Sequence, residues 1–414
     1  MLLVYQSLSV LIFIISPLII LIRIIKKRED TKRFKEKFCY FSKKRTSGKL
    51  IWFHGASIGE ILSVIPLIEK LEENKKIKQI LITSNTLSSS KILSEMKLKK
   101  TVHQFFPLDT NFHTQKFLNY WNPSLAIFID SEIWPNMITN IKKKSISLLL
   151  LNARITKKSF KKWRIFRSSA KEIFQKFDMC FPCSLASKKY LQLLGVKKIR
   201  YIGNLKFSQT EEGPLKYDFK NKHLFKKLWC ASSTHDSEEK ICGLVHKKLK
   251  TKYKDMLTII IPRHITRVQK IVNEMKKLDL KVQIHNSRNK IKKETDIYLV
   301  NSYGKTKPFF KICKTVFLGG SLIKHGGQNP LEAARYGCKI LHGPNISNFK
   351  EIYALLNKYR VSTKVNNINQ IIKNVDISFK QKNNSNNLKL KIKKLGKKIL
   401  NSTLKEVNFF VNKR

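Results

Sequence analysis

Short apolar runs that read as buried strands alternate with helical segments along most of this 414-residue chain. The first half holds LIWFH, QILITS, VHQFFPL, LAIFID and SISLLLLN, and the second half holds LWCASS, LTIIIPR, KVQIH, DIYLV, TVFLGG and KILHGP. Strands that alternate with helices predict parallel sheets with helices on both faces. Because the chain is too long for one ordinary core, we expect two α/β domains facing across a cleft. Ligands in such sheets bind beyond the carboxyl ends of the strands.

Composition shifts predict where these parts begin and end. The interruption of the alternation by turn-rich residues indicates a linker, and an amphipathic pattern closes the chain. The predicted parts are an N-terminal membrane anchor at 1–26, a Rossmann-like domain at 32–207, a linker at 208–222, a second Rossmann-like domain at 223–395 and a C-terminal helix at 396–414.

The first 22 residues contain no charged side chain, and RIIKKRED follows them at once. About 20 apolar residues suffice to cross a bilayer, and cations after the segment keep that side in the cytoplasm. A cleaved signal peptide would carry its positive charge first, so we expect a retained anchor. Pro17 leaves a shallow interfacial helix open as the alternative. The segment lies outside the alternating pattern, so the two cores are expected not to depend on it.

The formal charge of +55 suggests a polyanionic partner, which is nucleic acid, anionic lipid or a phosphorylated substrate. The lysines are scattered along the whole chain, which is typical of solvated helix faces, and the excess still favours an anionic membrane surface. A membrane-tethered nucleic-acid-binding protein is the rival class. It would show a basic patch interleaved with aromatic residues and a recognisable module. Neither is present, so no nucleic acid partner is expected.

Seven cysteines at irregular spacing do not form a disulfide framework and fit a reducing cytoplasm. Cys180 and Cys183 have the spacing of a zinc or redox pair. A zinc site would need a second pair or suitably placed histidines, so we interpret them as ordinary thiols at a strand end.

The first half holds four candidate residues, three of which follow strands. In IWFHGASIGEI, a glycine-rich turn leads into a helix that opens on Glu60, which is either a charge at the helix N-terminus or a base. Asp130 and Glu132 end the strand LAIFID, where two acids bind a cation, position a substrate or cap a helix. Lys206 lies near the predicted hinge, where an ammonium group would neutralise an anionic sugar.

The segment GGSLIKHGGQNPLEAARYG is the most informative part of the second half. Asn329 is predicted to cap a helix with a proline at its first position and Glu332 at its third. A purely structural cap is the alternative interpretation. Two glycine pairs upstream, which include Gly320 followed by Ser321, favour backbone N–H groups that approach a phosphate. Glu332 would then bind sugar hydroxyls.

Two further strand ends carry polar residues. Arg263 and His264 follow LTIIIP, where an arginine suits a phosphate or a carboxylate. A surface arginine–carboxylate pair is the alternative. In CASSTHDSEEK, Ser233 or Thr234 is a candidate cap, and capping alone would explain the acidic residues that follow.

Several catalytic motifs are absent. The chain has no H-E-x-x-H, Walker loop or G-x-S-x-G elbow, which disfavours metal-dependent hydrolysis, nucleotide hydrolysis and esterase chemistry. It also lacks a D-x-D motif of the kind that holds the metal of a nucleotide.

Taken in order, WFHGASIGE, FFPLDT, SEIWPN, LLNARI, GNLKF, SSTH, PRH and GGSL…GG.NPLEAA resemble the transferases of 3-deoxy-D-manno-octulosonic acid (Kdo) over roughly residues 32 to 360. These enzymes build the inner core of bacterial lipopolysaccharide. The resemblance implies a GT-B fold and transfer of Kdo from CMP-Kdo to the tetraacylated lipid A precursor lipid IVA. We also expect an inner-membrane location from the apolar N-terminus, and no cofactor or bound metal. A GT-B enzyme that uses another sugar nucleotide is the alternative activity.

The resemblance also assigns roles to residues. The general base falls on Glu60 and a second acid on Glu132, while Lys206 supports the substrate. The donor nucleotide falls on the second half, at Arg263, His264, Gly320, Ser321, Asn329 and Glu332. The family pattern is broken at Lys305, where a glutamate is usual, and at Gln328, which replaces a histidine.

Elementary electrostatics adds one expectation about Glu60. A helix N-terminus stabilises an adjacent carboxylate by about 0.3–1 kcal/mol, and a base must be ionised to accept a proton. We therefore expect the helix start to keep Glu60 ionised.

Overall fold

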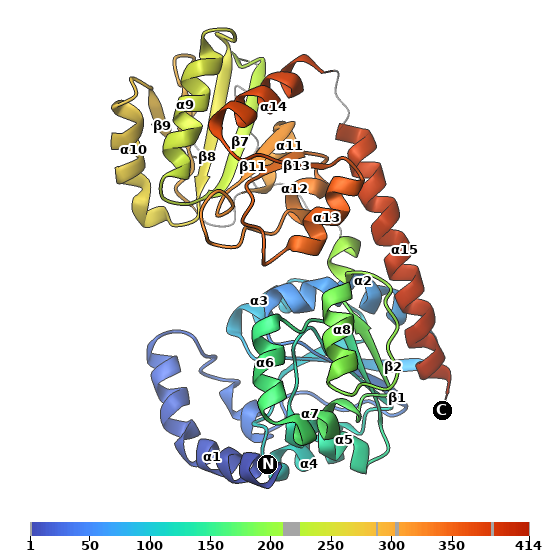
Figure 1. The fold of residues 1–414 in the computed structure, drawn as a ribbon. Coiled ribbons are helices and arrows are strands. Elements are labelled where there is room, and N and C mark those ends of the chain that lie inside the picture. The colour runs from blue at the N-terminus through green and yellow to red at the C-terminus, as the bar shows by residue number, and fades with distance from the viewer. Residues whose placement is uncertain (1, 210–223, 287–288, 303–305, 382–384, 414) are drawn as a thin grey trace. The chain divides into compact units, whose positions relative to one another are not determined.

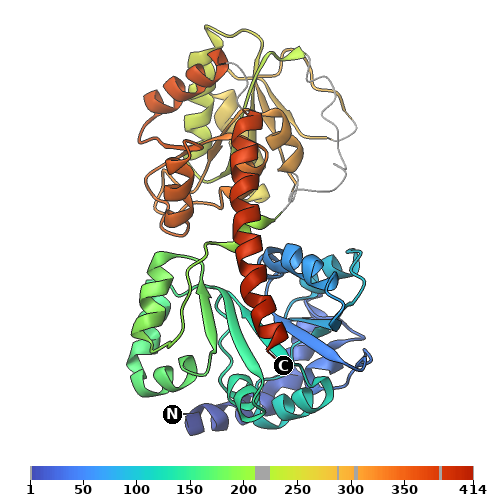
Figure 2. The same ribbon diagram turned by 90° about the vertical axis from the view of Figure 1, so that its right-hand side faces the viewer.

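The computed structural model describes residues 2–209, 224–286, 289–302, 306–381 and 385–413. By its internal contacts the chain divides into two units, Met1–Gln209 with Leu395–Arg414, and Thr210–Lys394. Each unit contains one parallel sheet with helices on both faces, as Figure 1 and Figure 2 show. The prediction of two parallel α/β sheets is confirmed. Apart from its first two residues, the predicted linker lies outside the described residues.

The sheet of the first unit has the strand order β3-β2-β1-β4-β5-β6. Its strands are β1 (Lys49–His54), β2 (Ile77–Ser84), β3 (Thr101–Phe105), β4 (Leu125–Ile129), β5 (Ser147–Ala153) and β6 (Met179–Pro182). The chain runs outward from β1 to β3, and then returns to β4 on the other side of β1. The strand order therefore reverses between β1 and β4, which is where open α/β sheets form a binding crevice.

Helices cover both faces of this sheet and bury its apolar side chains. They are α2 (Ile58–Glu72), α3 (Leu87–Ser94), α4 (Asn111–Trp121), α5 (Pro135–Lys143), α6 (Lys157–Ile165), α7 (Arg167–Phe174) and α8 (Leu185–Leu193), with short 3-10 turns η1 (Phe34–Phe38) and η2 (Leu205–Ser208). Trp52, Phe117 and Phe128 are fully buried in the core. The indole of Trp52 also donates to Thr83 Oγ1 at 2.9 Å, so the polar atom of this buried side chain is paired.

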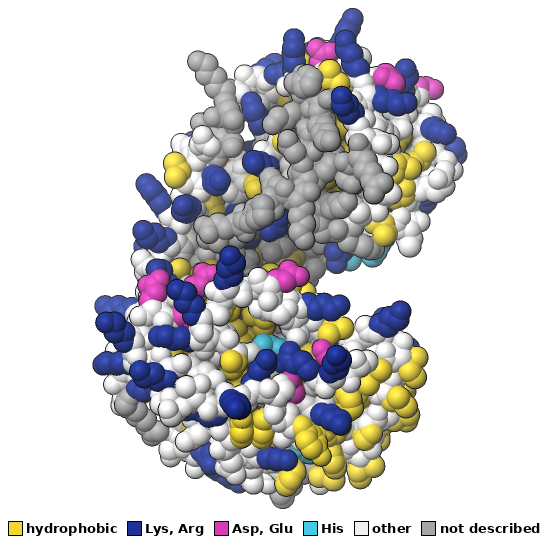
Figure 3. All heavy atoms as spheres, turned by 180° about the vertical axis from the view of Figure 1, so that it is seen from behind, with side chains coloured by type: hydrophobic (Ala, Val, Ile, Leu, Met, Phe, Trp, Pro, Cys, Tyr) yellow, Lys and Arg dark blue, Asp and Glu magenta, His cyan; other side chains and the backbone are white. Residues whose placement is uncertain are grey.

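Helix α1 (Leu2–Ile25) lies against the first unit. The Tyr5 hydroxyl donates to Asp109 Oδ2 at 2.8 Å, and Asn136 Nδ2 donates to Ser9 Oγ at 3.2 Å. Ser9, Ser16 and Ile20 are buried, and their spacing places them on one stripe of the helix. The helix is long and apolar enough to cross a membrane. Its other face is an exposed apolar surface, and Figure 3 shows these hydrophobic side chains gathered at the lower right.

The sheet of the second unit has the order β13-β12-β11-β7-β8-β10-β9. Its strands are β7 (Lys227–Thr234), β8 (Met256–Pro262), β9 (Val282–Ile284), β10 (Ile297–Leu299), β11 (Thr315–Leu318), β12 (Lys339–His342) and β13 (Ser362–Lys364). Here the order reverses between β7 and β11, so the crevice of this sheet lies at the ends of those two strands.

The helices around this sheet bury a second core that includes Trp229 and Phe317. They are α9 (Glu238–Lys250), α10 (Val268–Lys276), α11 (Lys307–Ile312), α12 (Leu331–Arg335), α13 (Lys350–Lys358) and α14 (Ile368–Lys380), with a 3-10 turn η4 (Ile265–Arg267).

The last turns of helix α15 (Ser385–Asn412) pack on the first unit. Lys49 Nζ donates to Val411 O at 2.6 Å, and Arg200 pairs with Glu406. Gly396 allows the closest approach, because a Cβ atom there would lie 2.3 Å from the carbonyl oxygen of Phe207. The C-terminal helix is thus held beside η2, which carries Lys206.

Candidate functional site

Glu60 lies at the third position of α2 and forms a capping box with Ser57. Its Oε2 accepts the amides of Ala56 at 2.7 Å and Ser57 at 3.3 Å, and its Oε1 accepts the Ser57 hydroxyl at 2.9 Å. The sequence S-x-x-E at residues 57–60 is the signature of this cap, and the sequence analysis did not use it. Both interpretations of Glu60 therefore have a structural basis, because the cap leaves the carboxylate at the carboxyl end of β1.

The pKa of Glu60 lies above its ordinary value. Burial, and then the neighbouring Glu132 and Asp130 carboxylates, raise the pKa of Glu60, while the Ser57 hydroxyl opposes the shift. The helix start stabilises the carboxylate only slightly, and desolvation and two like charges outweigh that stabilisation, so the net shift of the pKa is upward. A raised pKa brings a carboxylate closer to the operating pH, which suits proton transfer.

Glu132 is held by two aromatic donors. Its Oε2 lies 3.1 Å from His54 Nε2 and accepts the Trp134 indole N–H at 2.8 Å. Burial alone would raise the pKa of Glu132, but the hydrogen bonds from His54 and Trp134 lower it. His54 is fully buried, and its ring stacks on Phe106 with centroids 3.8 Å apart. The sequence analysis missed His54, although it ends β1 beside the strand-order reversal.

Asp130 and Lys206 form an ion pair at the same edge of the sheet, with 3.5 Å between Oδ2 and Nζ. Asp130 has a left-handed φ of 61°, a conformation that costs energy for a residue other than glycine. The turn η2 that carries Lys206 is held by Asn152, whose side-chain oxygen accepts the Leu205 amide at 3.0 Å. Three predicted residues, Glu60, Glu132 and Lys206, are thus all placed at the carboxyl edge of the first sheet.

In the second unit, a buried carboxylate occupies the glycine-rich turn after β11. Glu238 Oε2 accepts the Gly320 amide at 2.7 Å, and its Oε1 accepts the amides of Ser321 at 3.1 Å and Leu322 at 3.0 Å. Glu238 is fully buried and also accepts the His235 amide at 3.0 Å. The N–H groups of this first glycine pair were expected to approach a phosphate, but the Gly320 amide donates to Glu238 and the Gly319 amide donates to Ser232 O at 2.9 Å.

The side chains of this turn are equally committed to the fold. The Ser321 hydroxyl donates to Leu318 O at 2.5 Å and accepts the Gly343 amide at 2.8 Å. At Gly319 a Cβ atom would lie 2.5 Å from the Ser233 carbonyl oxygen, so glycine allows β7 and β11 to end in close contact. Gly320 and Ser321 therefore shape the crevice chiefly through packing.

Arg263 and His264 are exposed at the end of β8. No ion pair joins Arg263 to another residue in the described ranges. The arginine–carboxylate pair expected as the alternative occurs instead at Arg267, which donates to Glu239 Oε1 at 2.9 Å and pairs with Asp236. Arg263 is thus available to an anionic ligand.

Three histidines lie together beside Arg263. The His235 ring is 4.2 Å from His325 and 5.7 Å from His264, measured between centroids. Burial and these cationic neighbours lower the pKa of His235 to about 4, so it is neutral at physiological pH. His235 and His325 were not singled out from the sequence, because they lie 90 residues apart in the chain and only the fold brings them together.

Asn329 and Glu332 make contacts that differ from the prediction. Helix α12 begins at Leu331 with Pro330 as its cap residue, one position later than expected, and Asn329 Oδ1 still accepts the Leu331 amide at 3.1 Å. Glu332 Oε1 accepts the Thr306 hydroxyl at 3.0 Å. Lys305 lies outside the described residues.

The Cys180 thiol is fully buried in β6, and burial raises its pKa. Cys183 is partly buried in the turn after that strand. Among the described residues, no group of three or more His, Cys, Asp or Glu side chains is arranged to hold a metal ion.

Solved structures with the same fold support the arrangement of two α/β domains. UDP-GlcNAc 2-epimerase of Neisseria meningitidis matches with a TM-score of 0.56 at 13% identity, over 86% of this chain and 100% of that one. Alr3699/HepE of Anabaena matches with a TM-score of 0.55 at 10% identity, over 87% of this chain and 99% of that one. These likenesses concern the fold, and they confirm the predicted GT-B class.

Sequence relatives are more specific. Residues 32–209 match the family model of 3-deoxy-D-manno-octulosonic-acid transferase. The Kdo transferase of Rickettsia bellii is 35% identical over 84% of each chain. A probable mitochondrial Kdo transferase of Arabidopsis thaliana is 33% identical over 84% of this chain and 81% of its own length, and the Haemophilus influenzae enzyme is 29% identical over 74% and 73%. With this fold and these relatives, the chain is a glycosyltransferase that belongs to the Kdo transferase family.

Proposed function

We propose that this Kdo transferase uses CMP-Kdo as donor and lipid IVA as acceptor, with Glu60 as the general base. The observation that carries the proposal is the position of Glu60. It lies at the strand-order reversal of the first sheet, with a raised pKa and with Glu132 and Asp130 as charged neighbours. A second acid, Glu132, has its pKa lowered, so the two carboxyl groups are suited to different tasks.

In the proposed reaction the Glu60 carboxylate removes the proton from an acceptor hydroxyl. The hydroxyl oxygen then forms a bond to the anomeric carbon of Kdo, and the bond from that carbon to the phosphate oxygen breaks. CMP leaves with the electron pair. Glu132 remains ionised and holds His54 and Trp134 in place. Lys206 is the candidate partner for the carboxylate of the acidic sugar, and Asp130 holds its ammonium group.

The donor nucleotide is proposed to bind the second unit. Arg263 and His264 are exposed beside the end of β8, where their donors suit the phosphate of CMP. Gly320, Ser321, Asn329 and Glu332 are proposed to form the wall of this pocket, with Glu238 holding the turn in shape.

We propose that the enzyme binds its acceptor at the cytoplasmic face of the inner membrane. The exposed apolar face of α1 supports this location, and the charge of +55 favours an anionic lipid surface. The contacts of α1 with the first unit suit a helix that lies in the interface rather than one that leaves the domain to span the bilayer.

One assay tests the proposal directly. The purified chain is incubated with CMP-Kdo and lipid IVA, and the product mass is measured; an increase by one or more Kdo units is expected. Parallel reactions with UDP-hexoses test the alternative donor class. Product from a UDP-hexose but not from CMP-Kdo would overturn the donor assignment. Thermal protection by duplex DNA but not by CMP would favour the nucleic-acid-binding class.

The proposed reaction needs no added divalent metal. The leaving group is a nucleoside monophosphate, whose charge Arg263 and the helix terminus near Gly326 and Asn329 are suited to stabilise. We expect the initial rate in excess EDTA to stay within about twofold of the rate in buffer alone. Activity that disappears with EDTA and returns with Mg²⁺ would contradict this.

A further inference from the structure

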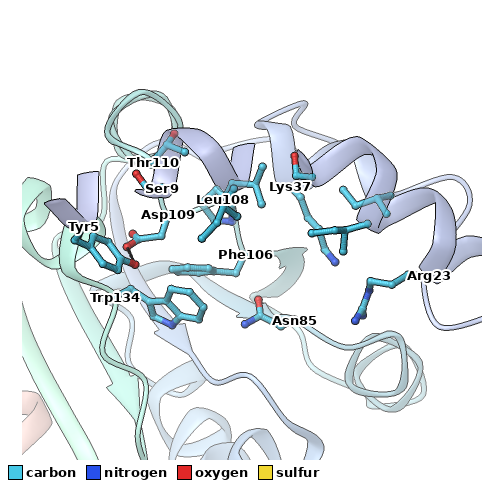
Figure 4. A pocket seen from close by; sticks show the side chains of 15 residues that line it. Tyr5, Ser9, Arg23, Lys37, Asn85, Phe106, Leu108, Asp109, Thr110 and Trp134 are labelled. Carbon is cyan, nitrogen blue, oxygen red and sulfur yellow. Dashed lines mark hydrogen bonds between the residues drawn. The ribbon is translucent and has the colours of Figure 1, made fainter. Parts of the chain in front are cut away.

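An apolar pocket of about 320 Å³ lies between α1 and the loop that follows β3. Its volume is at the lower end of the range of about 300–1,000 Å³ that is typical of ligand pockets. Figure 4 shows Phe106 and Trp134 along one side. Tyr5 and Asp109 lie at one end of the view, Arg23 and Lys37 lie toward the other, and Asn85 lies between them at the bottom.

The pocket opens along the surface that faces the membrane in the proposed function. Ile12 and Ile19 line it, yet they are 56% and 45% exposed and belong to the outward apolar face of α1. Leu108 lines it from the opposite side. An apolar cavity bordered by a bilayer-facing surface suits a hydrocarbon chain better than a soluble polar ligand.

One end of the pocket carries net positive charge. Arg23 Nε and Lys37 Nζ both contact the same oxygen of Glu29, at 2.8 Å and 2.6 Å, so two cations share one anion. A chain attached to a phosphorylated head group would therefore find a cationic end. The opposite end does not compete for it, because Asp109 is committed to Tyr5 and to the amides of Asn136 and Met137.

The two aromatic residues that line the pocket, Phe106 and Trp134, also border the group of polar side chains at the carboxyl edge of the first sheet. Phe106 stacks on His54, and Trp134 donates to Glu132, so each ring contacts both the pocket and the group of polar side chains near Glu60. The pocket therefore lies next to the polar side chains near Glu60, which favours the lipid acceptor as its occupant. A bulk membrane phospholipid would gain nothing from this adjacency.

We propose that this pocket binds one acyl chain of the lipid acceptor, with Arg23 and Lys37 directed at a phosphate of its head group. The proposal rests on the proposed function for the identity of the acceptor. It makes α1 part of the acceptor site as well as a membrane contact.

Filling the pocket from its two walls tests the proposal. Ile19→Trp narrows it from α1 and Leu108→Trp narrows it from the loop. Ile14→Trp is the matched control, because Ile14 is 67% exposed on the same helix and does not line the pocket. For both pocket variants we expect the KM for tetraacylated acceptor to rise about tenfold, with kcat and the KM for CMP-Kdo unchanged. The control is expected to stay within about twofold.

A deacylated acceptor separates chain binding from general damage. Its KM is expected to be the same in the wild type and in both pocket variants. If the variants impair the deacylated and tetraacylated acceptors equally, the pocket does not bind an acyl chain and the proposal is wrong.

Photo-crosslinking gives a readout that does not depend on turnover. A tetraacylated acceptor with a diazirine at the end of one chain is expected to label peptides that contain Ile12, Ile19 or Leu108, and unlabelled acceptor should reduce the labelling. Labelling by a phosphatidylglycerol probe that the acceptor fails to displace would overturn the acceptor assignment. If the wild type transfers no Kdo at all, the proposed function fails, and the labelling pattern alone then decides whether the pocket holds this lipid.

Discussion

The Glu60 side chain accepts hydrogen bonds from the first residues of its own helix, and two other carboxylates lie near it. These contacts determine which substitutions at this site are informative. A glutamine at the third position preserves a capping box. It accepts backbone amides with its oxygen and donates to the Ser57 hydroxyl with its nitrogen, but it cannot accept a proton. Glu60→Gln therefore separates the two interpretations of this residue.

We predict that Glu60→Gln keeps the free energy of unfolding within about 0.5 kcal/mol and lowers kcat by about 10²–10⁴-fold. Ser57→Ala is the opposite variant, because it removes the cap and leaves the carboxylate. It should cost about 1 kcal/mol of stability and retain most of the activity. Urea unfolding and initial rates measure both effects. Near-normal turnover in Glu60→Gln would remove Glu60 from the mechanism.

A second prediction concerns pH. A base works when ionised, so the rate rises with pH through the pKa of Glu60, which lies above its ordinary value of 4.5. Because the negative charge of Glu132 helps to raise that pKa, Glu132→Gln should move the acidic limb of kcat/KM to lower pH, whatever its effect on the maximal rate. Glu73→Gln, at an exposed position, is the control that should leave the limb in place. An unmoved or upward-shifted limb in Glu132→Gln would argue against the coupling.

At this scale the sequence predicted which residues lie at the strand ends but not how they are bonded. Glu60 and Glu132 follow apolar runs, and residues at such positions in an α/β pattern meet at one edge of a sheet. Lys206 was expected near the hinge and lies in η2. Glu238 was interpreted only as a capping acid. Its partners at 320–322 are more than 80 residues away in sequence, so no local pattern could show that it occupies the glycine-rich turn.

Among the elements, α15 depends on a glycine whose effect reverses the usual helix preference. In an exposed helix Gly→Ala stabilises by up to about 1 kcal/mol. At Gly396 the new Cβ would meet the backbone oxygen of Phe207 at 2.3 Å, and backbone cannot move aside cheaply.

We therefore predict that Gly396→Ala destabilises the protein by at least about 1 kcal/mol. Gly59→Ala is the control, because it lies in α2 with no atom within 4 Å of the added Cβ, and it should be neutral or stabilising. Thermal unfolding measures both variants. A stabilised Gly396→Ala would show that α15 does not approach η2 this closely in solution.

The two strands that were not predicted from the sequence are those that lack an apolar run. All eleven apolar runs form strands, but β6 and β13 were not predicted. The four residues of β6 include a proline, and the three residues of β13 are polar, so neither gives the signal of a buried strand. Their place at the edges of the sheets comes from tertiary pairing.

At the scale of the whole molecule, α1 is tied to the first unit. The expectation that the cores do not depend on residues 1–26 followed from the sequence pattern, and a sequence pattern does not reveal tertiary contacts. The structure adds the Tyr5–Asp109 and Asn136–Ser9 hydrogen bonds and the buried Ile20.

We predict that removing residues 1–26 lowers the free energy of unfolding by about 2.5–6 kcal/mol, from one buried isoleucine at about 1.5–3 kcal/mol and two hydrogen bonds at about 0.5–1.5 kcal/mol each. The truncated chain should also lose more activity on acceptor in anionic vesicles than on acceptor in detergent micelles. Urea unfolding in matched detergent and rates in the two acceptor systems are the measurements. Equal losses in vesicles and micelles would show that α1 does not act by localisation.

The buried Glu238 has a consequence for selectivity. The backbone amides of a glycine-rich turn ordinarily attract any small anion, and the cytoplasm is rich in inorganic phosphate. Here the carboxyl oxygens of Glu238 already accept the amides of residues 320–322, so these amides are not open to a phosphate group. Selection among sugar-nucleotide donors would then depend on the exposed cationic side chains and on contacts with the sugar and the nucleobase of the donor. An inhibitor that places a phosphonate at this turn would meet the carboxyl group of Glu238. An inhibitor that places its phosphonate beside Arg263 would meet an exposed guanidinium group instead.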